Sequence, residues 1–123
     1  MVTAMDTFNV DVAVGNLGDP ARNQRVSVMV DTGATYTTLP REIVEDLGCR
    51  PIGSRRVVLA DGREDEWPIA AVRVAVGGQE GPTFCLIGPP GGPALLGAVT
   101  LEEFALGVDP VAKRLVPVRS YLR

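Results

Sequence analysis

The chain has 123 residues, of which 46% are hydrophobic and 22% are charged, and its formal net charge is −3. This length predicts one domain with a single core, residues 1–123, and the composition excludes disorder as the main state. Because the net charge is negative and the basic residues form no stripe, nucleic acid is not an expected partner.

The first third of the chain predicts two strands and a short helix. Residues 1–10 contain neither a cationic leader nor an apolar span, so we expect a cytoplasmic protein with no membrane segment. Apolar residues alternate over residues 8–14, which predicts a half-buried strand, followed by a loop over residues 15–23. Residues 25–30 alternate less strictly and predict a second strand, buried on both faces.

A helix of about two turns is predicted between Pro40, placed near the first helical position, and Gly48, which acts as a stop. Beyond it, two extended arms flank Asp61-Gly62, a dipeptide that favours a type I′ hairpin turn because both positions accept positive φ. Gly77-Gly78 predicts a further turn, after which the chain returns as another strand.

The last third of the chain predicts a loop, a second helix and a final strand. Residues 88–93 are rich in glycine and proline but lack the lysine of a phosphate loop, so we expect a plain loop. Thr100 and Glu103 have capping-box spacing for a short helix. Pro117 restricts the final strand to an edge or a bulge. Together these elements predict a mostly β domain.

Carboxylate chemistry is what the composition leaves available. The chain has no histidine, which excludes Ser-His-Asp and Cys-His arrangements and most zinc hydrolase sites. Cys49 and Cys85 are too few and too far apart for a disulfide framework or a zinc site, and we expect free, buried thiols. Neither a metal ion nor another cofactor is predicted. Two carboxylates held together share a proton, and such a pair acts as acid and base at once.

Asp31 is the candidate for this chemistry, because it follows a strand in the segment VMVDTGATYTTLP, residues 28–40. An aspartate in this place is often only a turn residue, whose carboxylate accepts a hydrogen bond from a nearby backbone N–H. Gly33 has no Cβ and lets a chain or a substrate approach, and Thr32 offers a hydroxyl group. The tripeptide alone leaves turn capping and catalysis both open.

The segment VDTGATYTTLP resembles the active-site motif of retroviral-type aspartic proteases, and the resemblance continues in order along nearly the whole chain. A helix follows the motif, then a long glycine-tipped hairpin where that family has its flap. The segment ALLGAVTLEEFALGVDP is similar to the one that closes the family's fold. The likeness to small cellular and bacterial members implies a mainly β, closed, antiparallel, barrel-like fold with one or two short helices and a flap hairpin.

The resemblance also implies roles for individual residues. Asp31 would be the catalytic carboxylate, Thr32 would hydrogen-bond its counterpart across a dimer, and Gly33 would bind substrate backbone. Ala34 and Thr35 would support the site. The flap would contain Asp61, Gly62 and Trp67. Packing beneath the active-site loop would come from Leu95, Leu96 and Gly97. Thr35 and Ala98 depart from viral members, which have an acid and an arginine there that brace the dimer, so the dimer contacts must differ.

Two functions from different classes remain open: an aspartic endopeptidase that acts on peptides or proteins as a homodimer, and a peptide-binding or scaffold module that cleaves nothing. Because DTG occurs once and DSG does not occur, the second carboxylate must come from another chain. The resemblance implies that residues 7–14 and 114–123 form the interface. Trp67 fits a flap anchor or a core side chain equally well. The acidic run 61–66 fits a solvated face or a bias against acidic substrates.

Overall fold

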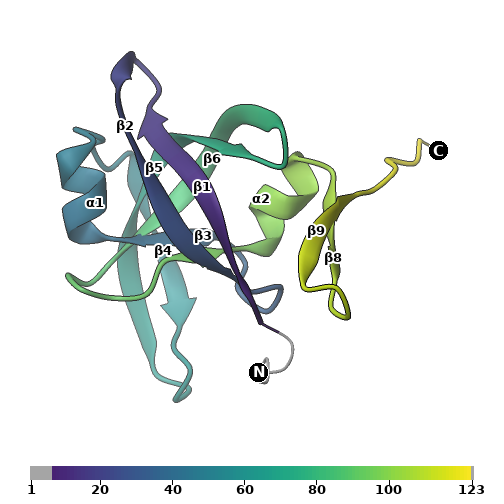
Figure 1. Cartoon of the computed structure of the whole chain (residues 1–123). Helices are drawn as coiled ribbons and strands as arrows, with labels where there is room; N and C mark the ends of the chain where they lie inside the picture. Colours follow the sequence, from purple (N-terminus) through teal and green to yellow (C-terminus); the bar gives the residue numbers. More distant parts are fainter. Residues whose placement is uncertain (1–6, 123) are drawn as a thin grey trace.

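The computed structural model describes residues 7–122, which form a mainly β fold with two short helices (Figure 1). The strands are β1 (Asn9–Asn16), β2 (Asp19–Val30), β3 (Thr37–Pro40), β4 (Gly53–Val58), β5 (Glu64–Val76), β6 (Gln79–Gly88), β7 (Leu95–Leu96), β8 (Leu106–Asp109) and β9 (Arg114–Pro117). The helices are α1 (Arg41–Asp46) and α2 (Ala98–Glu103). Neither helix in the described part of the chain has the length and apolar character of a membrane span. Residues 1–6, where no leader is expected, lie outside the described residues.

Seven strands form one sheet in the order β1-β2-β7-β3-β6-β5-β4. Residues 13–15 of β1 also pair with β5, so the sheet closes on itself and β4 is appended beside β5. The predicted mainly β fold is confirmed, but the β2–β7 and β3–β6 pairings are parallel rather than antiparallel. A parallel pair needs a long crossover, and between β3 and β6 the helix α1 and the β4–β5 hairpin supply it.

The hairpin of β1 and β2 is tighter than the sequence predicted. The loop expected over residues 15–23 is only two residues long, because β2 already begins at Asp19. The first half of β2 is polar and exposed, so no apolar alternation marks it as a strand. The expected burial of β2 on both faces is wrong, since Val28 and Val30 are buried whereas Ser27 is exposed.

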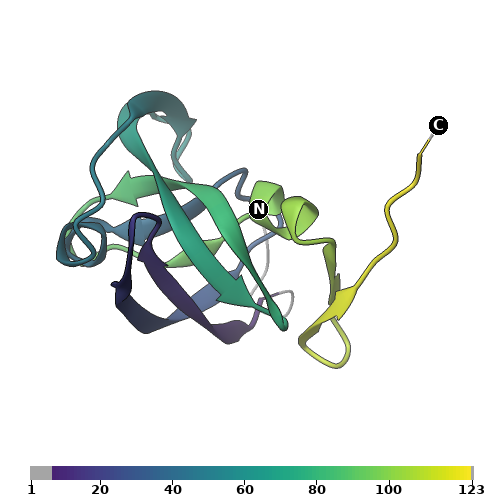
Figure 2. The ribbon, with the colours of Figure 1, turned by 90° about the horizontal axis from the view of Figure 1, so that it is seen from above.

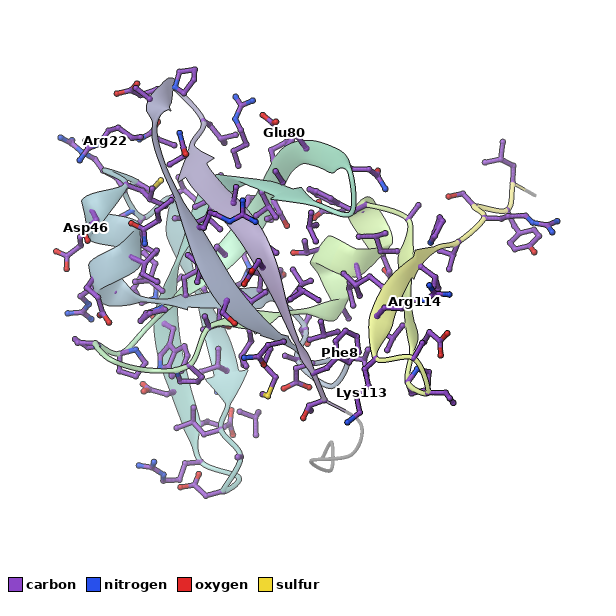
Figure 3. The ribbon with its side chains drawn as sticks, in the orientation of Figure 1. Phe8, Arg22, Asp46, Glu80, Lys113 and Arg114 are labelled. Atoms are coloured by element: carbon purple, nitrogen blue, oxygen red, sulfur yellow. The ribbon has the colours of Figure 1, made fainter. Side chains whose placement is uncertain are left out.

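The core lies inside the closed sheet, and α1 and α2 contribute to it. Its best-buried large side chains are Val12, Val14, Val28, Val30, Leu39, Val44, Leu47, Val72, Val74, Leu96, Leu101 and Phe104. The predicted first helix is present, with Pro40 as the N-cap and Gly48 following it at φ 70°. Arg22 reaches from β2 to the end of α1, where it donates to the carbonyl of Asp46 at 2.9 Å (Figure 3). A cation bound to a free terminal carbonyl stabilises a helix C-terminus.

The C-terminal part of the fold contains both confirmed and unexpected elements. Gly77 and Gly78, with φ of 60° and 78°, form the predicted two-residue turn between β5 and β6. The glycine-proline stretch is a loop, as expected. The final strand β9 is also confirmed, and it pairs with β8, a strand that the sequence did not predict. Figures 1 and 2 show that this hairpin and the tail after it project away from the closed sheet.

Candidate active site

Asp31 stands where β2 leaves the sheet. Its N–H donates to the carbonyl of Leu96 at 3.0 Å, which extends the parallel β2–β7 pairing. Its Oδ1 accepts the N–H of Gly33 at 3.0 Å, and its carbonyl accepts the N–H of Ala34 at 3.1 Å. The side chain is half-buried, and no described residue hydrogen-bonds its Oδ2. The turn-capping role is therefore present, but it uses only one of the two carboxylate oxygens.

Residues 31–36, here called the Asp31 loop, are fixed by the first turn of α2. The N–H of Ala98 donates to the carbonyl of Ala34 at 2.8 Å, and the N–H of Val99 donates to the carbonyl of Thr35 at 2.9 Å. The first N–H groups of a helix have no partner within the helix, so the loop satisfies donors that would otherwise need water. The helix start and the loop are thus stabilised by the same bonds.

The outer residues of the Asp31 loop face solvent. Thr32 and Gly33 are exposed, and the Thr32 hydroxyl has no hydrogen-bond partner within residues 7–122. An exposed glycine beside a half-buried carboxylate leaves room for another backbone to approach. The loop therefore presents Asp31, an unused hydroxyl and an open backbone position on one surface.

Gly97 allows the Asp31 loop to lie directly against the start of α2. A Cβ placed on Gly97 would lie 2.5 Å from the carbonyl oxygen of Tyr36 and 2.7 Å from the nitrogen of Thr37. Leu96 is buried and Leu95 half-buried, and their short strand β7 lies between β2 and β3. Leu96 and Gly97 thus contact the Asp31 loop, while Leu95 pairs with Met29 of β2 and Thr38 of β3.

The turn of the β4–β5 hairpin differs from the predicted type I′ turn. A type I′ turn requires positive φ at both central residues, but only Gly62 has it, at 87°, and Asp61 does not. The N–H of Leu59 donates to the carbonyl of Arg63, and the N–H of Gly62 donates to the carbonyl of Leu59, both at 2.8 Å. The connection is longer than two residues, so one glycine in the left-handed conformation completes it.

Asp61 stabilises this turn through both of its carboxylate oxygens. Its Oδ1 accepts the backbone N–H of Arg63 at 3.0 Å, and its Oδ2 accepts the Nε–H of Arg63 at 2.6 Å. These backbone and side-chain hydrogen bonds lower the pKa of the Asp61 carboxyl. The carboxylate is therefore held ionised against its own hairpin.

A family model described as aspartyl protease matches residues 10–108. The chain belongs to the aspartyl protease family. Among solved structures, EIAV protease in complex with the inhibitor HBY-793 aligns with a TM-score of 0.65 and 17% identity, over 94% of this chain and 98% of that one. Simian foamy virus (mac) protease aligns with a TM-score of 0.55 and 21% identity, over 77% of this chain and 92% of that one. The predicted retroviral-type fold is confirmed. No match was found among curated proteins.

Thr35 and Ala98, where the resemblance implies an acid and an arginine in viral members, bond to neighbouring segments through their backbone in this member of the aspartyl protease family. Thr35 is exposed, and its carbonyl accepts the N–H of Val99. Ala98 donates its N–H to Ala34. Among the described residues no side-chain ion pair joins these two positions. Within one chain, backbone hydrogen bonds join the Asp31 loop to the start of α2 at these two positions.

Trp67 lies well behind the tip of the hairpin. It is half-buried on β5 and pairs with Arg55, three residue pairs back from the last pair, Val58 with Glu64. Its indole Nε1–H donates to Asp65 Oδ2 at 3.1 Å. Its ring lies 3.6 Å from the Cβ position of Gly88 on β6. This position favours a packing side chain at the base of the hairpin over an anchor at its tip.

A chain of buried threonines supports the site, and the sequence interpretation missed it. Thr37 Oγ1 and Thr100 Oγ1 lie 2.6 Å apart, and Thr100 Oγ1 lies 2.8 Å from Thr83 Oγ1. Thr37 Oγ1 also accepts the N–H of Gly97 at 3.1 Å. The predicted capping box is wrong, because α2 begins after Gly97 and Thr100 is buried inside the helix. The threonines that follow the DTG motif, Thr37 among them, were the feature of the sequence that could have indicated this chain.

The two cysteines are free, as predicted. Cys85 is completely buried, and burial raises the pKa of its thiol to about 12. Burial also raises the pKa of the half-buried Cys49 thiol. A protonated thiol is a weak nucleophile and a weak metal ligand. Within residues 7–122 no group of three or more His, Cys, Asp or Glu side chains is placed to hold a metal ion.

Two shallow cavities lie along β1 and β5, away from the predicted site residues. One, of about 280 Å³, includes Arg22, Arg73 and Glu80, and the other, of about 340 Å³, lies beside it near Gly77 and Gly78. Arg73 Nη1 donates to Glu80 at 2.9 Å, while its buried Nε has no hydrogen-bond partner in the part of the chain that the structure describes. Neither cavity is lined by Asp31 or by another residue of the Asp31 loop.

Proposed function

We propose that this member of the aspartyl protease family is an endopeptidase that acts as a homodimer, with two Asp31 side chains activating one water molecule. The observation that carries the proposal is the placement of Asp31 at a strand end, held from behind by Leu96. The N–H of Gly33 donates to Asp31 Oδ1, and within residues 7–122 no group hydrogen-bonds Asp31 Oδ2. A fixed carboxylate with one free oxygen suits a partner carboxylate and a water molecule.

In the proposed reaction the ionised carboxylate of the pair removes a proton from water, and the water oxygen attacks the carbonyl carbon of the peptide bond. The protonated carboxyl donates a hydrogen bond to the carbonyl oxygen and polarises it. The leaving nitrogen takes from the first carboxyl the proton that came from water, and the C–N bond breaks. The reaction needs no covalent intermediate, and it uses two carboxylates because a single one cannot be acid and base at once.

The assay for the proposal is cleavage of a denatured protein at acidic to neutral pH. Hydrolysis that a statine-type transition-state analogue blocks would support the endopeptidase. Peptide binding without any hydrolysis would instead identify a binding module with the same fold.

Two features of the chain support a homodimer. Among described residues β9 pairs only with β8, so its outer edge is open to another strand. The tail after β9 exposes Val118, Tyr121 and Leu122 by 48%, 82% and 97%, and it points away from the body (Figure 2). An exposed apolar tail beside an open strand edge suits an interface between chains.

The predicted use of the N-terminal strand in the interface is restricted by the fold. Residues 13–15 of β1 already pair with β5, so within the predicted interface segment only residues 9–12 of β1 have a single neighbouring strand. Arg123, the end of the other predicted interface segment, lies outside the described residues. We therefore propose that β9 and its tail make the larger contribution to the dimer.

The dimer predicts that activity depends on chain concentration. Specific activity should fall on dilution, because each dissociated chain holds only one DTG aspartate. Mixing wild type with a ninefold excess of Asp31→Asn chains should lower wild-type specific activity about tenfold, because random pairing then gives few wild-type pairs. An equal mass of an unrelated protein serves as the control. Full activity of a sedimenting monomer at the assay concentration would exclude this mechanism.

We also propose that the β4–β5 hairpin closes over the substrate as a flap. Gly62→Val should then lower kcat/KM by more than its loss of stability accounts for. A β-branched residue is unfavourable at a φ of 87°, so the substitution should change the conformation of the hairpin tip. No heavy atom lies within 4 Å of a Cβ placed on Gly62, so the effect would come from the backbone and not from a clash. The measurements are kcat/KM and the melting temperature.

Gly78→Val is the matched control for the flap. Gly78 also has a positive φ, 78°, with no neighbour within 4 Å, but it lies in the β5–β6 turn. Each substitution should cost about 1–3 kcal/mol of folding free energy. Only Gly62→Val should also slow turnover. Equal kinetics in the two variants would show that the Gly62 turn is purely structural.

A further inference from the structure

Arg55 of β4 joins the hairpin to the Asp31 loop through aromatic contacts. Its guanidinium carbon lies 6.0 Å from the ring centroid of Tyr36 and 5.9 Å from that of Phe84. Tyr36 is the last residue of the Asp31 loop. Phe84 lies beside it on β6, since the parallel register pairs the next residues, Thr37 and Cys85. The guanidinium is thus held over two rings, next to the loop that carries Asp31.

Arg55 has no acidic partner within residues 7–122. The ion pairs of the described chain are Arg56–Glu64, Arg63–Asp61, Arg73–Glu80 and Arg114–Asp109. Among the described residues, the Arg55 guanidinium makes one hydrogen bond, from Nη1 to the carbonyl of Ser54, at 3.0 Å. Contact with rings engages the face of a guanidinium and leaves the N–H groups at its edge available. Nε and Nη2 are therefore free to bind an acceptor from outside the chain.

The acidic run of the hairpin does not neutralise Arg55. Successive side chains of a strand point to opposite faces, so Arg55 and Trp67 share one face, and Arg56 and Glu64 lie on the other. Asp65 shares the Arg55 face, but its carboxylate accepts the Trp67 indole N–H at 3.1 Å and a backbone N–H at 2.8 Å. The acidic run 61–66 suggested a bias against acidic substrates. On the face of the hairpin that carries Arg55, the positive charge of Arg55 would act in the opposite direction.

From this geometry we propose that Arg55 binds a glutamate or aspartate side chain of the peptide substrate and selects substrates that carry one near the scissile bond. A guanidinium offers two parallel N–H groups that match the two oxygens of a carboxylate. The two rings restrict the arginine in advance, so less side-chain entropy is lost when the carboxylate binds. The inference rests on the proposed function, because it takes the Asp31 loop as the place where the peptide is cleaved.

The test uses octapeptides of one sequence in which each position in turn is Glu, Gln or Lys. At one position the wild type should cleave the Glu peptide about fivefold to tenfold faster in kcat/KM than the Gln peptide, mainly through KM. The ratio should shrink as salt is added, because exposed charges are screened. Arg55→Glu should reverse the preference and favour Lys at that position.

Arg56→Glu is the matched control, because it makes the same change one residue away on the opposite face of β4. It should keep the wild-type ratio of Glu to Gln cleavage. An equal loss on Glu and Gln peptides in Arg55→Glu, with their ratio unchanged, would show that Arg55 only braces the hairpin and would overturn the proposal.

Binding to the Asp31→Asn protein separates this inference from the proposed function. Fluorescence anisotropy with labelled Glu and Gln peptides should give the same fivefold to tenfold ratio in Kd, in roughly the range of a charge-assisted bond. Absence of cleavage of every peptide by the wild type would overturn the endopeptidase, while the binding ratio would still decide the role of Arg55. Cleavage by the wild type with no preference for Glu would overturn the role of Arg55 alone.

Discussion

Asp31→Asn is expected to lower kcat/KM for peptide hydrolysis by roughly 10²–10⁴-fold or more, with the fold and self-association intact. The amide is nearly the same size as the carboxylate, and its oxygen can still accept the N–H of Gly33. An amide cannot share a proton with a partner carboxylate, so the acid–base pair is lost. Steady-state cleavage, circular dichroism and sedimentation would be measured on the same preparation.

Asp19→Asn is the control that shares the local geometry of Asp31. Asp19 Oδ1 accepts the N–H of Ala21 at 3.1 Å, the same two-residue spacing as the bond from Gly33 to Asp31. Asp19 begins β2, whereas Asp31 follows its last residue, so the control lies at the other end of the strand. Asp19→Asn should keep wild-type activity. Asp31→Asn activity within about tenfold of wild type would rule out Asp31 as the catalytic group.

The elements that the sequence predicted are those fixed by local chemistry. Alternating apolar residues marked β1, Pro40 and Gly48 bounded α1, and the glycine pair at 77–78 marked a turn. β7 has only two residues, Leu95–Leu96, and exists because β2 and β3 pair with it from either side. Such a strand has too few residues to show a period, and only its distant partners define it.

The candidate site likewise has residues that the sequence predicted and residues that it did not. Asp31, Thr32 and Gly33 are adjacent in the chain, so their motif was visible in the sequence. Thr100 was misassigned as a cap because its spacing to Glu103 fits a capping box, while its actual partners come from β3 and β6. Arg55, similarly, meets its rings only after β3, β4 and β6 have assembled. Side chains joined from distant segments leave no local pattern.

Gly97→Ala is expected to destabilise the fold by about 3 kcal/mol or more, because the new Cβ would meet backbone atoms of Tyr36 and Thr37 at 2.5 and 2.7 Å. The backbone of Gly97 itself is not the cause, since its φ of −96° is accessible to alanine. A clash with a side chain could be relieved by rotation, but these neighbours are main-chain atoms. Urea unfolding at one fixed protein concentration would measure the loss, because dimerisation also contributes to apparent stability.

Gly53→Ala supplies the comparison for Gly97→Ala, since the nearest atoms to its Cβ position are 4.0 Å away and the strand conformation accepts alanine. It should change stability by no more than about 0.5 kcal/mol. In Gly97→Ala, relief of the clash must move either the Asp31 loop or the start of α2, which the bonds of Ala98 and Val99 hold together. Activity should therefore fall further than the unfolded fraction accounts for. A Gly97→Ala protein within about 1 kcal/mol of wild type would show that the loop can move away from α2 at little cost, and Asp31 would then stand on a far less rigid support than these contacts indicate.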